Sequence, residues 1–172
     1  MLDNRILGAA DVRTFFCRHL SLATVLMGVQ QTRTAMAWQR VDDPKDVRSL
    51  FLRDSPGFGL IPEATPRPTE VVFDKLGMSA FAGTPLDMAL RDYGVVAVAI
   101  VGVVLEIGIA PTVAHATDLG SVPVVIADAC GSVDDAARQR ALDGIDHALM
   151  SVTTDAATFR GLLRAVGADS AG

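Results

Sequence analysis

Apolar residues come in short runs separated by turn residues, and most runs are followed by an amphipathic segment. The longest run, Val95–Leu105, has eleven residues, is rich in valine and follows Gly94. Because a membrane-spanning helix needs about 20 apolar residues, this run predicts a buried strand over 96–103. Similar patterns predict strands over 12–17, 70–74, 122–127 and 149–153, and helices over 31–40, 84–93, 109–119 and 133–144, and from 154 onward.

From Val71 onward, the predicted strands alternate with helices. This order is typical of right-handed βαβ units, so it predicts an α/β fold with a parallel sheet covered by helices on both faces. A length of 172 residues favours a single domain over residues 1–172. Residues 4–10, which precede the first predicted strand, have the pattern of the last turns of a helix. Ser132 and Asp135 are expected to cap the helix over 133–144.

Ligands of parallel α/β sheets bind beyond the carboxyl ends of the strands. The residues expected at that edge are Arg18, His19, Lys75, the segment 104–108 and Asp128. Lys75 directly follows a strand, so its ammonium group can hold an anion or tune a nearby acid. An exposed lysine in a salt bridge is the alternative.

The segment Gly102–Ile109 is a turn from a strand into a helix. The first N–H groups of a helix lack partners within it and favour negative charge. A reacting carbonyl or a carboxylate could therefore be held at Val104, Gly108 and Ile109. The alternative is that Gly108 only permits a tight turn.

Residues 21–68 are rich in proline and glycine, with one helix predicted around Trp38. Such density indicates a long ordered loop, and loops of this length are often functional, although a plain surface connection is equally consistent. Candidate residues for the wall of a substrate pocket are Arg18, His19, Arg33, Trp38 and Arg40.

Charge and composition indicate which classes of binding partner the protein is expected to have. The net charge is -5, without a basic cluster, which excludes nucleic acid as a favoured partner. The first ten residues lack the pattern of a signal peptide, so a cytoplasmic protein without membrane attachment is expected. Cys17 and Cys130 lie in or beside apolar runs and are read as structural residues of a reducing compartment. His115 falls within a helix, and neither a metal site nor a cofactor-binding fingerprint is predicted.

Four motifs, in order and spacing, resemble the isochorismatase-like, or cysteine hydrolase, superfamily. They are Phe73–Lys75 with Ser79–Leu86, the strand 98–103, Glu106–Ile109 with Thr112, Ala116 and Gly120, and Val124–Cys130. The likeness covers about residues 11–159 and is weakest across the long loop.

The resemblance implies a Rossmann-like sheet and, in most members, a catalytic Asp–Lys–Cys group that hydrolyses amides. Lys75 matches the lysine, whereas Gly108 occupies the position of the cysteine. The aspartate belongs at the end of a first strand, which is not found in this sequence. True isochorismatases, which hydrolyse a vinyl ether, resemble this chain in having glycine at that position. The resemblance also implies a non-proline cis peptide at Val103–Val104, a homo-oligomer and no cofactor.

Three hypotheses follow. The first is a hydrolase of a small, anionic molecule that works without the cysteine nucleophile. The second is a catalytically inactive member that binds a ligand or forms oligomers. The third is a shortened chain that lacks the central strand of its sheet and is poorly stable, or that completes its sheet with another chain.

Overall fold

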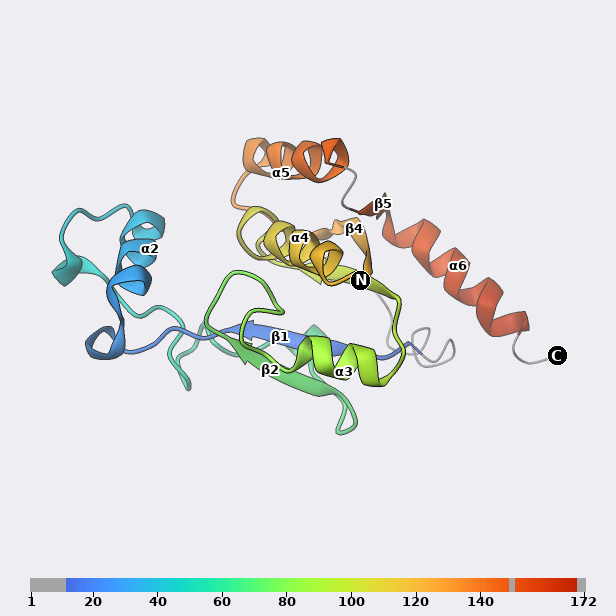
Figure 1. The fold of residues 1–172 in the computed structure, drawn as a ribbon, viewed down its shortest axis with the longest axis horizontal. Coiled ribbons are helices and arrows are strands. Elements are labelled where there is room, and N and C mark those ends of the chain that lie inside the picture. Colours follow the sequence, from blue (N-terminus) through green and yellow to red (C-terminus); the bar gives the residue numbers. More distant parts are fainter. Residues whose placement is uncertain (1–11, 149–150, 170–172) are drawn as a thin grey trace.

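The computed structural model describes residues 12–148 and 151–169. Its strands are β1 (Phe15–His19), β2 (Val71–Lys75), β3 (Ala97–Gly102), β4 (Val122–Cys130) and β5 (Val152–Thr154) (Figure 1). Its α-helices are α2 (Val29–Gln39), α3 (Leu86–Asp92), α4 (Ala110–Asp118), α5 (Asp135–His147) and α6 (Ala156–Asp169). A π-helical turn, η4 (Leu105–Ile109), leads directly into α4, and three short 3-10 turns are η1 (Thr24–Leu26), η2 (Pro44–Asp46) and η3 (Pro62–Ala64). The helix end expected over 4–10 lies outside the described residues.

All described strand pairs are parallel, which confirms the predicted α/β fold. The strands nevertheless form two ladders rather than one sheet. One ladder is β1–β2, in which Phe15 pairs with Val71 and His19 with Lys75. The other has the order β3–β4–β5. In Figure 1, β1 is the strand of its ladder that lies nearer to the three-stranded ladder.

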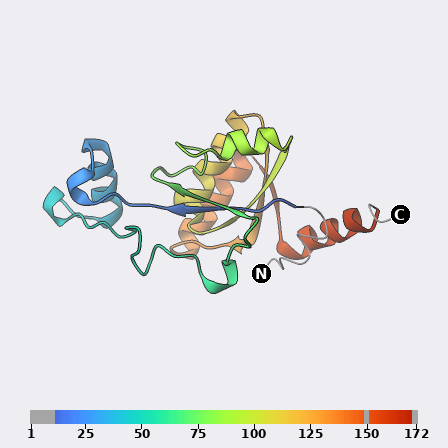
Figure 2. The ribbon, with the colours of Figure 1, turned by 90° about the horizontal axis from the view of Figure 1, so that it is seen from below.

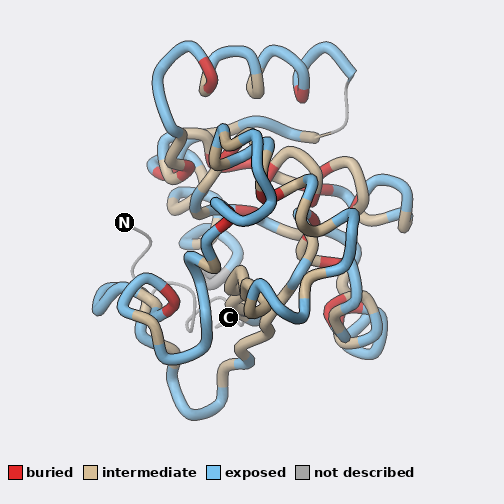
Figure 3. The backbone as a smooth tube through the Cα atoms, turned by 90° about the vertical axis from the view of Figure 1, so that its left-hand side faces the viewer, coloured by how far each residue is buried: buried red, intermediate tan, exposed pale blue. Residues whose placement is uncertain are grey.

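Helix α4 connects the cores of the two ladders. Its Val113 is fully buried in a cluster with Ile100 of β3 and Val125 of β4. One turn later, the fully buried Ala116 belongs to a second cluster, against which Phe15 and Phe73 of the other ladder pack. Apolar residues three positions apart lie on one face of a helix, so a single helix covers parts of both ladders. Helix α5, at the top of Figure 3, turns its buried positions towards the other elements.

The starts of α3 and α5 show where local sequence signals predict a helix cap correctly and where they do not. The Thr84 hydroxyl accepts the Leu86 N–H at 3.3 Å, so the expected turn begins α3, although the helix itself starts at Leu86, two residues after the start of the predicted range 84–93. The predicted cap of α5 is wrong: Asp134, not Ser132, accepts the Ala137 N–H at 2.6 Å. Both residues have suitable side chains, but the Ser132 hydroxyl donates to Glu106 instead.

Strand β4 continues past Asp128 to Cys130, three residues beyond its predicted end. The Asp128 carboxylate accepts the Ala156 N–H at the start of α6 at 2.8 Å. Asp128 thus stabilises a helix N-terminus, where negative charge is favoured. This contact accounts for an acidic residue in a largely apolar strand.

The segment between β1 and β2 extends away from both ladders, on the side opposite α6 (Figures 1 and 2). It contains the predicted helix, α2, and is otherwise irregular. Its first part, residues 22–49, is closed at its base next to β1, because Ser21 N–H donates to Phe51 O at 2.9 Å and Ser49 Oγ donates to Leu22 O at 2.6 Å. None of the described helices is both long enough and apolar enough to cross a membrane.

Candidate active site

His19 and Lys75 are the last residues of β1 and β2, and they are paired across the ladder. Successive side chains of a strand point to opposite faces, so Cys17, His19 and Lys75 share one face. The sequence placed His19 and Lys75 at this edge, whereas it read Cys17 only as a core residue. The structure brings the three together.

The Lys75 ammonium group is held by backbone oxygens. Its Nζ donates to Gly77 O at 2.9 Å and to Met78 O at 2.5 Å. Burial lowers the pKa of Lys75, and the nearby Cys17 acts in the opposite direction. Among the described residues, no carboxylate forms an ion pair with Lys75. A half-buried cation with carbonyl partners alone retains the capacity to bind an anion.

His19 connects Lys75 to the long loop. Its ring lies 5.8 Å from the ring of Trp38 in α2 and 5.7 Å from that of Phe51. Burial and the charge of Lys75 both lower the pKa of His19. Burial likewise raises the pKa of the Cys17 thiol, although Lys75 opposes this. The neutral forms of both groups are therefore favoured beside the lysine.

Arg18 lies on the opposite face of the ladder. Its Nε and Nη2 each lie 2.8 Å from Asp74 Oδ1, and Arg53 Nη2 lies 3.0 Å from Asp74 Oδ2. The Arg18 guanidinium also lies over the Phe58 ring, 4.3 Å from its centroid. Its charge is thus compensated within the chain, and the structure does not bring Arg18 together with Lys75.

The elbow after β3 has the predicted cis peptide at Val103–Val104. The Val104 carbonyl accepts N–H groups from Ile107 at 3.3 Å, Gly108 at 2.8 Å and Ile109 at 3.2 Å. The Gly108 and Ile109 N–H groups, expected to be open to a substrate oxygen, therefore already have an acceptor. Within the described part of the chain, the Val104 N–H has no hydrogen-bond acceptor.

Gly108 does not owe its presence to a tight turn. A Cβ atom built at Gly108 would meet only Val103 O, at 4.0 Å, and its φ is not positive. Gly131 differs, because a Cβ there would lie 2.5 Å from Val103 Cγ1. The elbow thus requires a small residue at Gly131 but leaves room for a side chain at Gly108.

The loop after Lys75 is fixed to the elbow through α4. Ala80 N–H donates to Thr112 Oγ1 at 2.9 Å, and the same hydroxyl donates to Gly108 O at 2.6 Å. One turn on, His115 Nδ1 lies 3.0 Å from Oγ of the buried Ser79. His115 thus makes a contact from a helix face, as the sequence suggested. This chain of hydrogen bonds sets the position of the lysine loop relative to Gly108.

Sequence reasoning named Glu106, an acid within the elbow, in a family motif but gave its carboxylate no role. Its carboxylate accepts from Ser132 Oγ at 2.5 Å and from Val133 N–H at 3.1 Å. Burial disfavours its ionisation, but these hydrogen bonds outweigh burial and lower the pKa of Glu106. The acid therefore joins the elbow to the segment after β4. No local pattern signals this contact, since it spans 26 residues.

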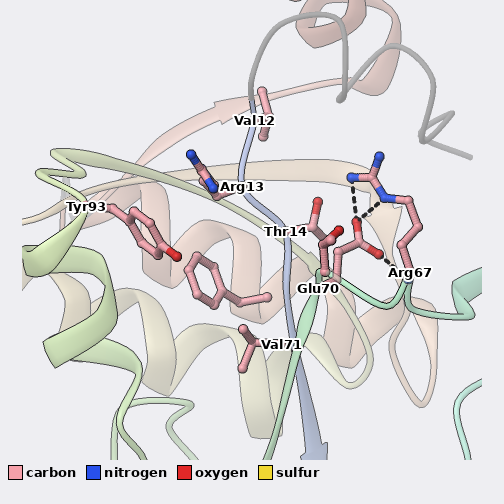
Figure 4. Close-up of a pocket in the computed structure, with 9 residues that line it drawn as sticks. Val12, Arg13, Thr14, Arg67, Glu70, Val71 and Tyr93 are labelled. Carbon is pink, nitrogen blue, oxygen red and sulfur yellow. Dashed lines mark hydrogen bonds and ion pairs between the residues drawn. The ribbon is translucent and has the colours of Figure 1, made fainter.

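A cavity of about 210 Å³ lies at the other end of the first ladder, where its strands begin (Figure 4). Glu70 and Arg67 form an ion pair of 2.8 Å in its wall, and the Arg13 guanidinium lies 4.8 Å from the centre of the Tyr93 ring. Ligands of parallel sheets bind at the carboxyl ends of strands. The cavity is therefore separate from the candidate site at Lys75.

A parallel α/β fold with a lysine and a strand-to-helix elbow at one edge is the arrangement expected from the resemblance to isochorismatase-like hydrolases. The isochorismatase domain model matches residues 5–157, so the chain belongs to the isochorismatase family.

Solved structures agree on the fold. An isochorismatase family protein from Desulfovibrio vulgaris is 20% identical over 94% of this chain and 80% of its own, with a TM-score of 0.77. A cysteine hydrolase from Pseudomonas syringae is 20% identical over 95% of this chain and 78% of its own, with a TM-score of 0.76. N-carbamoylsarcosine amidase from Thermoplasma acidophilum is 19% identical over 88% of this chain and 77% of its own, with a TM-score of 0.70.

Proposed function

We propose that the protein hydrolyses a small, anionic molecule without forming a covalent enzyme intermediate. The observation that carries this proposal is the combination of Lys75, a half-buried cation without a described carboxylate partner, with Gly108, where the family resemblance places a thiol. Lys75 would hold the anionic group of the substrate. The Val104 N–H would donate to a substrate oxygen on which charge develops.

Without a nucleophile at position 108, a vinyl ether could still be hydrolysed if a general acid supplied a proton to its vinyl carbon. Water would then add to the resulting oxocarbenium ion, and the hemiketal would release the alcohol and the carbonyl product while a proton returns to the acid. This chemistry fits an acid-labile bond such as a vinyl ether better than an amide, because an amide usually requires a stronger nucleophile or an activated water. Trp38 and His19 would form an aromatic wall beside Lys75, since their rings already touch.

A second function is supported by one observation. Among the described residues, no carboxylate forms an ion pair with Lys75, and burial raises the pKa of the nearby Cys17 thiol. A member of the family that binds an anionic ligand without turning it over would keep the same lysine and elbow. It would lack only the groups that carry out hydrolysis.

The deciding experiment combines turnover and binding with a panel of anionic vinyl ethers and amides. We expect turnover of vinyl ethers, with kcat/KM lowered at least ~100-fold in Lys75→Ala. The matched control is Lys45→Ala, which removes an exposed lysine in the long loop and should leave turnover unchanged. Binding that requires Lys75 without any turnover would favour the second function. Neither binding nor turnover, or full activity of Lys75→Ala, would reject the site.

A further inference from the structure

Two nitrogen donors at the carboxyl end of the β1–β2 ladder share one backbone oxygen. Lys75 Nζ donates to Gly77 O at 2.9 Å, and the imidazole of His19 donates to the same carbonyl. The two residues are also paired across the ladder, so their side chains lie on one face of it. The lysine ammonium group and the imidazole therefore form a single cluster.

Contacts on several sides hold the imidazole in this cluster. Its ring meets the rings of Trp38 and Phe51 edge-on, at 5.8 Å and 5.7 Å. Just beyond His19, Leu20 N–H donates to Lys75 O at 2.8 Å, which carries the pairing of the two strands past the imidazole. The ring is thus positioned next to Lys75 before a ligand binds.

The charges around His19 are of one sign. Among the described residues, the titratable groups on its face of the ladder are the Lys75 ammonium group and the Cys17 thiol. Trp38 and Phe51, from α2 and the long loop, bring rings without charge. No described carboxylate forms an ion pair with His19 or Lys75. A second positive charge in this cluster would lack a counter-ion, so the neutral imidazole is favoured in the free protein.

We propose that His19 is a second anion-binding residue of this site, which takes up a proton from solvent when an oxyanion binds beside Lys75. The inference rests on the anion site of the proposed function. The bound oxyanion supplies the missing counter-ion and thereby favours the imidazolium form. Protonation turns the acceptor nitrogen of the ring into a second donor, which adds a charge-assisted hydrogen bond to the ligand. The proton returns to solvent when the ligand leaves.

The cluster also indicates which ligands it fits. Two cationic donors from different strands suit a carboxylate, sulfonate or phosphate group, whose charge is spread over at least two oxygens. Binding of the anion and binding of the proton strengthen each other by the same factor. Affinity should therefore rise as the pH falls towards 6.5, the ordinary pKa of histidine. A site with Lys75 as its sole cation would bind equally well across this range.

Titration calorimetry on the full chain with benzenesulfonate tests the proposal. This probe stays ionised at every pH used, and heats measured in two cationic buffers with different enthalpies of ionisation give the number of protons taken up. At constant ionic strength, Kd should fall at least ~3-fold from pH 8 to pH 6. Proton uptake should increase as the pH falls from 8 towards 6.5. The single tryptophan, Trp38, gives an independent fluorescence signal for binding, because its ring contacts His19.

Variants assign the proton to one residue. His19→Gln should bind at every pH with the affinity that the wild type has at pH 8, without proton uptake. The matched control is His147→Gln, at the exposed end of α5, which should behave as the wild type does. Lys75→Met should not bind the probe.

The possible outcomes separate this inference from the proposed function. Binding that requires Lys75 but depends on neither pH nor buffer would overturn the role of His19 and leave the hydrolase proposal standing. Proton uptake that increases towards alkaline pH would assign the proton to Lys75 and also overturn it. Absence of binding at any pH would reject the anion site together with this inference. Proton-coupled binding by a protein that hydrolyses no compound of the panel would support the role of His19 and reject the hydrolase.

Discussion

The two faces of the β1–β2 ladder differ although they are built from neighbouring residues. On one face, the Asp74 carboxylate is shared by the guanidinium groups of Arg18 and Arg53. On the other, the partners of Lys75 among the described residues are two backbone carbonyls, and Lys75 lies beside a thiol and an imidazole. A charge satisfied within the chain contributes to stability, whereas a charge left without its counter-ion is where a ligand can act. One residue step separates the two roles.

Removing the charge on the satisfied face should have the largest effect on stability. Asp74→Ala leaves two guanidinium groups without their carboxylate, and the Asp74 side chain is only 16% exposed. We expect the free energy of unfolding to fall by about 2–3 kcal/mol, slightly less than for a fully buried pair. Urea unfolding at pH 7 measures this change.

The matched control is Asp87→Ala, which breaks the exposed pair with Arg91 within α3. Such a pair is worth no more than about 0.5 kcal/mol. If both variants lose equally little stability, the ion pairs of Asp74 with Arg18 and Arg53 do not stabilise the fold. The contrast between the two faces of the ladder would then disappear.

On the face that carries Lys75, removing the charge should not lower stability. Burial lowers the pKa of Lys75, so folding disfavours its charged form, and stability rises with pH between the folded and the ordinary pKa of 10.5. At pH 7 the charged form is present in both states, so Lys75→Met should not lower the urea midpoint and should abolish anion binding. A clear loss of stability, of the size expected for Asp74→Ala, would show that Lys75 is a structural residue.

His19 should give the same face a dependence on pH. Its pKa is lowered from 6.5, so the unfolded chain takes up a proton first as the pH falls. Stability is therefore complete above pH 6.5 and is lost between 6.5 and the lowered pKa. The loss should be much smaller than that expected for Asp74→Ala, because His19 is only half-buried and solvent screens part of the effect.

His19→Gln should flatten the pH profile of unfolding in this window, while His147→Gln, at the exposed end of α5, should leave it unchanged. An identical slope in wild type and His19→Gln would place His19 in solvent rather than beside Lys75.

Sequence patterns predicted what depends on neighbouring residues. A valine-rich run that follows a glycine located β3, and the short strand pattern over 70–74 placed Lys75 at the carboxyl end of β2. The patterns failed where distant residues compete for one group. Ser132 has a capping side chain, but Glu106, 26 residues earlier in the chain, takes its hydroxyl. The division into two ladders was likewise not visible, because strand runs do not reveal which edges are left unpaired.

The elbow also combines a closely packed position, Gly131, with an open one, Gly108. A substitution at the open position should have the smallest effect on the free energy of unfolding. Because a Cβ at Gly108 would meet only Val103 O at 4.0 Å, Gly108→Ala should raise the free energy of unfolding by about 0.5 kcal/mol, through loss of backbone freedom in the unfolded chain. The control is Gly144→Ala, at an open position within α5, where a gain of about 0.5–1 kcal/mol is expected. If Gly108→Ala instead loses stability while Gly144→Ala gains it, the turn itself requires glycine. The absence of a side chain at position 108 would then be explained by the backbone of the turn. It would no longer support hydrolysis without a nucleophile.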